Sequence, residues 1–186
     1  MAGTALIVVD MLNPYDHPDA DKLIESVETV VDPIARLIAR AGDEATQVIY
    51  VNDNYGDWDS SSRRLTETAL AGRRSDLVEP IVPEHGTPFV IKARHTIFYG
   101  TPLEYLLGQT ETDRIVLVGQ VTEQCILYSA LDAYVRHMQV VVPSDAVAHI
   151  HADLADAALE MMRVNMDAEI VSAAEVAFDA ASRSGG

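Results

Sequence analysis

The chain has 186 residues, 48% of them hydrophobic, which is enough for one folded domain with a substantial core and excludes a mainly disordered protein. The formal net charge of −16 argues against nucleic acid and anionic membrane surfaces as partners. The single cysteine cannot form an internal disulfide. No apolar run approaches the roughly 20 residues of a membrane span, and residues 1–10 contain no basic leader. We therefore expect a soluble, cytoplasmic protein.

Apolar runs and helical periodicity alternate along the chain. Residues 4–9 form a short apolar run rich in β-branched side chains, which predicts a buried strand. Residues 21–41 repeat apolar side chains at helical spacing, and Pro33 within them predicts a kink or a break. Residues 72–88 are rich in turn-forming residues and give no assignment. Further strands are predicted at residues 47–51, 89–92, 115–118, 139–142 and 168–171, and further helices at residues 65–70, 101–107 and 151–164 and from Thr122 onward.

This alternation predicts an α/β fold, a three-layer α-β-α sandwich with a mostly parallel, Rossmann-like sheet of about six strands. The strands are almost continuously apolar, as expected where helices cover both faces of a sheet. No repeat, low-complexity tract or linker divides the chain. Residues 1–178 are therefore predicted to form a single domain, followed by a flexible tail at residues 179–186.

The only cysteine lies at the start of the helix that follows the fourth predicted strand. Gly119 ends the apolar run and helical periodicity begins at Thr122, which places Cys125 in the first turn. There, free backbone N–H groups and the positive end of the helix dipole favour the thiolate, which is the nucleophilic form. The side chains predicted to form the buried stripe of this helix are Ile126, Leu127, Ala130, Leu131, Tyr134 and Val135.

Three chemically reactive side chains, Asp10, Lys92 and Cys125, lie at or just beyond the ends of three predicted strands. The carboxyl ends of parallel strands meet at one edge of a sheet, where ligands bind, so all three can face one crevice. Each also has an ordinary structural explanation, since a lone cysteine packs as a small hydrophobe, an aspartate caps a turn and a lysine solvates a sheet edge. Together they supply a nucleophile, a base and a cation, which is a workable set for covalent catalysis.

Three motifs surround these residues in a fixed order, and a fourth pattern follows them. They are Val8-Val9-Asp10-Met11 with Asn13; Lys92 with Phe98, Thr101 and Leu103; Gly119-Gln120-Val121-Thr122-Glu123-Gln124-Cys125 with Ala130, Asp132 and Ala133; and Val142-Pro143-Ser144-Asp145-Ala146. With these motifs the chain resembles the isochorismatase-like cysteine hydrolases over residues 5–178. This superfamily includes nicotinamidases and N-carbamoylsarcosine amidohydrolases.

The resemblance implies a hydrolase that cleaves the C–N bond of a small amide or carbamoyl compound through a thioester on Cys125. It implies that Asp10, Lys92 and Cys125 are the catalytic triad. It also implies a cis peptide between Gln120 and Val121, with the N–H groups of Val121 and Cys125 forming an oxyanion hole. A small-molecule substrate, no cofactor and a homodimer or homotetramer are further expectations from the resemblance.

The sequence departs from its relatives at the position of a metal site. Nicotinamidases of the superfamily carry an Asp-x-His signature after the second strand, where this chain has Asp53-Asn54-Tyr55, and His95 follows Lys92 too closely to be assumed the missing ligand. We therefore predict no bound metal, and we do not expect nicotinamide to be the native substrate. His149 and His151 have a spacing that can suit a metal, but a surface loop explains them better.

Loops near the predicted crevice contain polar and aromatic side chains that suit a planar amide. For Trp58, a substrate pocket and a subunit interface are equally good explanations. The residues predicted to bind substrate are Tyr15, Asn54, Tyr55, Trp58, Phe98 and Thr122, with Tyr99 nearby.

Three other functions are weighed against amide hydrolysis. A vinyl-ether hydrolase acting on an isochorismate-like substrate would use Asp10 as general acid, although enzymes of that type need no cysteine at position 125. A redox or flavodoxin-like binding protein would require a glycine-rich phosphate loop after the first strand or a second cysteine, and the sequence has neither. A catalytically silent family member is disfavoured by the presence of all three triad residues.

Overall fold

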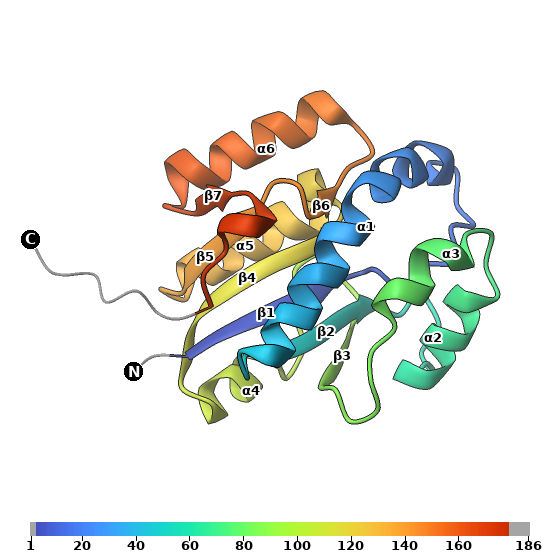
Figure 1. Ribbon diagram of the computed structural model, residues 1–186, viewed down its shortest axis with the longest axis horizontal. Coiled ribbons are helices and arrows are strands. Elements are labelled where there is room, and N and C mark those ends of the chain that lie inside the picture. The colour runs from blue at the N-terminus through green and yellow to red at the C-terminus, as the bar shows by residue number, and fades with distance from the viewer. Residues whose placement is uncertain (1–2, 179–186) are drawn as a thin grey trace, which may run out of the picture.

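The computed structural model describes residues 3–178, and at its centre is a seven-stranded sheet (Figure 1). Six strands are ordered β3-β2-β1-β4-β5-β7, β6 pairs with β4, and every pair is parallel. The strands are β1 (Gly3–Val9), β2 (Gln47–Asp53), β3 (Phe89–Lys92), β4 (Thr112–Gln120), β5 (Gln139–Pro143), β6 (Val147–Ala148) and β7 (Glu169–Val171). The predicted α/β class with a parallel sheet is confirmed, and β6 is a strand that the apolar pattern did not reveal.

Helices connect the strands and cover the sheet. None of the helices within residues 3–178 combines the length and the apolar character that crossing a membrane requires. The tail predicted at residues 179–186 lies outside the described residues. The α-helices are α1 (Ala20–Asp43), α2 (Ser62–Leu70), α3 (Ser75–Val78), α4 (Leu103–Gln109), α5 (Leu127–Val135) and α6 (Ala152–Asn165); η1 (Glu79–Ile81) and η3 (Ala173–Glu175) are 3₁₀ turns, and η2 (Thr122–Ile126) is a π-helical turn.

Alternate residues of β1 face opposite sides of the sheet, and this alternation divides the core into two parts. Leu6 and Val8 pack in the cluster that contains the apolar face of α1, which lies across one side of the sheet (Figure 1). Ala5 and Ile7 pack in the second cluster, to which α4, α5 and α6 contribute. The predicted three-layer arrangement is therefore confirmed.

Several elements extend further than their apolar patterns predicted, among them α1, β2 and β4. α1 continues through Pro33, and the carbonyl that loses its hydrogen-bond donor there belongs to Thr29, which lies at an exposed position. β2 continues through Asn52 and Asp53, and the Asn52 side chain accepts a 2.9 Å hydrogen bond from the N–H of Leu12. This extension matters because it carries Asp53 to the carboxyl edge of the sheet.

The buried stripe predicted for the helix after β4 is only partly correct. Ile126 and Ala130 are buried as expected. However, the chain first forms the π-helical turn η2 and only then the α-helix α5, which changes the direction in which the later side chains point. The predicted core residues that are exposed instead are Leu131, Tyr134 and Val135.

Candidate active site

Asp10 follows directly after β1 and is anchored from several sides. Its φ of 54° is in the left-handed region, its N–H donates to the carbonyl of Val51, and its carbonyl accepts a 2.6 Å hydrogen bond from the Gln120 side chain. Carboxylate Oδ1 accepts a 2.7 Å hydrogen bond from the N–H of Asp53, and Oδ2 faces Lys92. The carboxylate is therefore fixed at the end of its strand.

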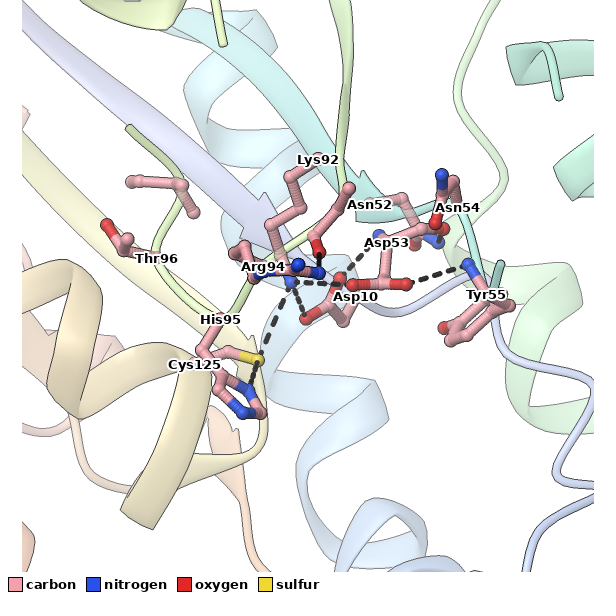
Figure 2. A network of polar contacts seen from close by, with 12 residues as sticks. Asp10, Asn52, Asp53, Asn54, Tyr55, Lys92, Arg94, His95, Thr96 and Cys125 are labelled. Atoms are coloured by element: carbon pink, nitrogen blue, oxygen red, sulfur yellow. Dashed lines mark hydrogen bonds and ion pairs between the residues drawn. The ribbon is translucent and has the colours of Figure 1, made fainter. Parts of the chain in front are cut away.

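Lys92, the last residue of β3, places a buried ammonium group among three other side chains (Figure 2). Its Nζ lies 2.8 Å from Asp10 Oδ2, 3.6 Å from Asp53 Oδ2 and 3.6 Å from Cys125 Sγ. The second carboxylate is supplied by the sheet register, which pairs Asp53 with Lys92. The side chain is only 1% exposed, so these partners offset the cost of removing the charge from water. The structure thus brings Asp10, Lys92 and Cys125 together as predicted.

Cys125 lies between this buried network and the molecular surface. Its Sγ is in contact with Lys92 Nζ and, at 3.6 Å, with His95 Nδ1 (Figure 2). His95 is exposed, and its ring packs at a tilt against Tyr128 with the ring centroids 5.5 Å apart. The sulfur therefore has a buried ion pair on one side and an exposed imidazole on the other.

The turn that carries Cys125 begins with a cis peptide bond between Gln120 and Val121, as predicted. The Val121 carbonyl then accepts hydrogen bonds of 3.0 Å from the N–H of Gln124 and 3.1 Å from the N–H of Ile126. These bonds close the turn around the carbonyl and leave Cys125 near the middle of η2. The oxyanion hole at the N–H groups of Val121 and Cys125 stays a prediction.

Gly119 and Glu123 fix this turn to the rest of the sheet. Gly119 has φ of 116°, and a Cβ there would overlap the carbonyl oxygen of Val9 on the neighbouring strand. Glu123 is buried, and its Oε1 accepts hydrogen bonds of 3.0 and 2.8 Å from the N–H groups of Ile150 and His151. The first residue allows β1 and β4 to approach each other, and the second ties the turn to the segment before α6.

Burial determines the protonation states of the site. It raises the pKa of the Asp10 carboxyl above its ordinary value, although Lys92 opposes the shift. Burial and then the Asp10 charge raise the pKa of the Cys125 thiol, which Lys92 offsets only in part. For Lys92, burial acts to lower the pKa, but Asp10, Cys125 and Asp53 outweigh it and raise the value.

The sequence predicts that the helix start favours the thiolate, whereas burial acts in the opposite direction and raises the pKa of the Cys125 thiol. The energetic cost of desolvating a charged sulfur beside the Asp10 carboxylate exceeds what the local cation provides. Burial thus favours the protonated form of the Cys125 thiol and also raises the pKa of the Asp10 carboxyl beside it. Such a pair is suited to moving a proton from Cys125 to Asp10 when the sulfur attacks.

A cleft of about 440 Å³ is lined in part by Lys92. Of the residues predicted to bind substrate, Asn54 and Trp58 line this cleft, and Tyr55 follows Asn54 and is half exposed. The Trp58 side chain is 83% exposed, which is compatible with both a pocket wall and a subunit contact. The cleft is also lined by Asp57, Ser60, Ile91, Ala93, Arg94, Tyr99 and Gly100.

The other three residues predicted to bind substrate are buried, namely Tyr15, Phe98 and Thr122. Thr122 Oγ1 donates a 2.9 Å hydrogen bond to the carbonyl of Ala148, and the Arg136 guanidinium covers the Phe98 ring. These side chains support the turn and the loops from within and do not line the cleft. Loop position alone does not distinguish a side chain that points outward from one that packs inward, and a role of these three residues in substrate binding stays a prediction.

Comparison with known proteins identifies the family. The Isochorismatase domain model matches residues 4–175. The chain belongs to the isochorismatase family. It is 30% identical over 175 residues to the uncharacterized isochorismatase family protein YaaI of Bacillus subtilis (strain 168), covering 94% of this chain and 97% of that protein. It is 28% identical over 157 residues to maleamate amidohydrolase of Pseudomonas putida, covering 80% and 74%.

A solved structure supports the same assignment. The crystal structure of N-carbamoylsarcosine amidase from Thermoplasma acidophilum superposes with a TM-score of 0.71 and 28% sequence identity, covering 95% of this chain and 99% of that chain. The protein is thus an enzyme of the isochorismatase family, and the resemblance inferred from its motifs is confirmed.

Two close neighbours of Lys92 and Cys125 in this isochorismatase-family enzyme were not predicted, Asp53 and His95. The apolar run of β2 ends at Val51, so the pattern gives no sign that the strand continues to Asp53. A histidine three residues after Lys92 was visible in the sequence, but nothing in its spacing indicated that the loop returns to the sulfur of Cys125.

The residues present do not fit the metal site of nicotinamidases. Residues 3–178 contain no group of three or more His, Cys, Asp or Glu side chains arranged to hold an ion. Tyr55, which replaces the expected histidine, uses its N–H to donate a 2.7 Å hydrogen bond to Asp53 Oδ1. The His149 ring contacts Ser26 Oγ at 3.1 Å. The absence of a bound metal stays a prediction.

Proposed function

We propose that this isochorismatase-family enzyme hydrolyses the C–N bond of a small amide or carbamoyl compound, with Asp10, Lys92 and Cys125 as its catalytic triad. The observation that carries the proposal is the buried Lys92 ammonium, which lies 2.8 Å from Asp10 and 3.6 Å from Cys125. Two relatives, maleamate amidohydrolase and N-carbamoylsarcosine amidase, are named for amide hydrolysis, which supports this reaction class.

In the first half of the reaction, Asp10 accepts the thiol proton while Cys125 Sγ attacks the carbonyl carbon. Lys92 stabilises the negative charge that the two groups share during this transfer. The N–H groups of Val121 and Cys125 donate hydrogen bonds to the oxyanion. When the C–N bond breaks, Asp10 returns the proton to the departing ammonia or amine, and the acyl group stays on the sulfur as a thioester.

In the second half, water hydrolyses the thioester. Asp10, again a carboxylate, accepts a proton from the attacking water, and the acid product leaves as the C–S bond breaks. The proton then returns to Cys125, which restores the resting thiol. The same carboxylate serves both halves because its raised pKa allows it to accept and to return a proton.

The proposal is tested by measuring ammonia release from a panel of small amides, ureido acids, carbamoyl amino acids and lactams. The wild-type protein should hydrolyse at least one compound, and Cys125→Ala should reduce kcat/KM for it by at least about a thousandfold because no thioester can form. Arg36→Gln, a change at an exposed residue of α1, is the matched control. Equal ammonia release by the wild-type and Cys125→Ala proteins would contradict the proposal.

We also propose that the enzyme forms a homo-oligomer through α5. Tyr128, Leu131 and Val135 are spaced along one face of this helix and are 44%, 47% and 64% exposed. Contiguous exposed apolar side chains are typical of protein–protein contact surfaces. A second copy of this chain is the partner that the family resemblance implies.

A further inference from the structure

Arg94 lies between two residues that touch the nucleophile. Lys92 precedes it by two positions and His95 follows it directly, and both side chains lie 3.6 Å from Cys125 Sγ. Arg94 lines the cleft of about 440 Å³, and it also lines an adjoining hollow of about 300 Å³ with His95 and Tyr128. Arg94 therefore lines two hollows that also contain the residues in contact with the sulfur, Lys92 and His95.

This guanidinium is unusual in its lack of an acidic partner. Within residues 3–178, eight of the ten arginines lie within 4.0 Å of a carboxylate oxygen. The exceptions are Arg36 and Arg94, although the chain has 29 acidic and only 13 basic residues. Arg94 donates one hydrogen bond, of 2.8 Å, to the carbonyl of the preceding Ala93. Most of its donors are thus available to a ligand.

The other cation of the site cannot take this role. Lys92 is buried, and its ammonium is already shared between Asp10 at 2.8 Å and Asp53 at 3.6 Å. Asp57, an acidic residue of the cleft, is itself paired with Arg64 at 3.0 Å. A ligand in the cleft therefore meets one unpaired positive charge, and a planar guanidinium matches a carboxylate through two parallel hydrogen bonds.

We infer that the substrate is a short amide that also carries a carboxylate, and that Arg94 binds this carboxylate and so orients the scissile carbonyl toward Cys125. The inference rests on the amide hydrolysis proposed above. A short substrate suits this arrangement, because Arg94 and Lys92 line the same cleft and Lys92 Nζ lies 3.6 Å from the sulfur. The exposed rings of Trp58 and Tyr99 provide walls for the connecting atoms.

Hydrolysis of matched substrate pairs tests this inference. Each pair combines a short half-amide or N-carbamoyl amino acid with its neutral diamide or amide counterpart. The wild-type protein should prefer the acid, and Arg94→Gln should reduce the acid-to-neutral ratio of kcat/KM by about ten- to a hundredfold, mainly through KM. Arg94→Lys should keep part of the preference, and Arg36→Gln, which removes the other unpaired arginine, should keep all of it.

Alkylation of the single cysteine gives a second readout that needs no amide hydrolysis. Iodoacetate carries a carboxylate, and iodoacetamide is its neutral counterpart. The ratio of their rates at Cys125 should fall about tenfold in Arg94→Gln and stay unchanged in Arg36→Gln. An unchanged ratio in Arg94→Gln would overturn the inference whatever the hydrolysis panel shows.

The two proposals fail in different ways. Amide hydrolysis by the wild type without any preference for acids would overturn the role of Arg94 and leave the proposed function standing. An Arg94-dependent alkylation ratio with no ammonia release from any amide would support the carboxylate site and contradict the proposed reaction.

Discussion

At the scale of single residues, one ammonium group holds the site together. Lys92 is 1% exposed and faces two carboxylates and a thiol, which come from β1, β2 and the turn after β4. A lysine in this position costs free energy to bury, and its partners recover that cost only while all of them stay in place. Stability and catalysis therefore depend on the same contacts.

Lys92→Met should destabilise the protein, because it removes the charge and leaves Asp10 buried without its partner. The loss in the free energy of unfolding should be about 3–5 kcal/mol, measured by urea denaturation. Lys22→Met is the control, since Lys22 is an exposed residue that contacts Asp19 at 3.9 Å, and its loss should cost less than about 1 kcal/mol. Adding Asp10→Asn to Lys92→Met should restore part of the stability, and a further loss would contradict this account.

The activity should fall in acid at a pH above the ordinary aspartate value of 3.8, because burial raises the pKa of Asp10. Asp10 must be ionised to accept the thiol proton, so protonation of its carboxyl as the pH falls removes the base. A profile of kcat/KM against pH locates the pH at which activity falls on the acid side. Circular dichroism at each pH verifies that the protein stays folded. If activity fell only at or below the ordinary aspartate pKa, Lys92 and not burial would dominate the environment of Asp10.

At the scale of elements, the site is built from strand ends that lie side by side in the sheet. β1 ends before Asp10, β2 ends at Asp53, β3 ends at Lys92, and β4 leads into the turn that holds Cys125. Gly119 makes this arrangement possible, because the two central strands approach each other too closely there for a side chain.

Gly119→Ala should therefore destabilise the fold. The left-handed φ of 116° alone should cost about 1–3 kcal/mol, and the new Cβ would also overlap the Val9 carbonyl. Gly42→Ala is the control, because nothing lies within 4 Å of the added atom and the residue is in α1, so it should be neutral or stabilising by up to about 1 kcal/mol. Thermal melting of the two variants compares the effects, and equal melting temperatures would contradict the prediction.

The elements also show which features the sequence could predict. Buried parallel strands are near-continuous apolar runs, so most strands were predictable, and with them the positions of Asp10, Lys92 and Cys125 near strand ends. Asp53 was not, because β2 continues through polar residues that satisfy their hydrogen bonds inside the protein. The exposed face of α5 was not predictable either, because a π-helical turn leaves no mark in the apolar period but rotates the side chains that follow.

At the scale of the whole molecule, the exposed face of α5 lies beside the active site. Tyr128 belongs to this apolar face and also packs against His95, which contacts the Cys125 sulfur. A second copy bound to α5 would therefore border the entrance to the sulfur. In the proposed assembly, the Tyr128 ring would link the subunit contact to substrate access.

Leu131→Glu should break the proposed assembly, because it places a charge on the apolar face of a chain whose net charge is already −16. Light scattering coupled to size-exclusion chromatography should show an oligomer for the wild type and a smaller species for the variant. Val164→Glu, at an exposed apolar residue of α6, is the control and should leave the mass unchanged. A monomeric wild-type protein would contradict the proposal.

The single cysteine also makes the motion of this part of the protein measurable. Cys125 is 8% exposed, and the side chains in contact with its sulfur, Lys92 and His95, come from a segment about 30 residues earlier in the chain. A bulky thiol reagent can reach the Cys125 sulfur only when the residues around it move apart. Its reaction rate therefore reports the frequency of local opening at this end of the molecule. Because the 186-residue chain has one cysteine, the rate of thiol modification reports local opening at this one site, and no residue has to be introduced to measure it.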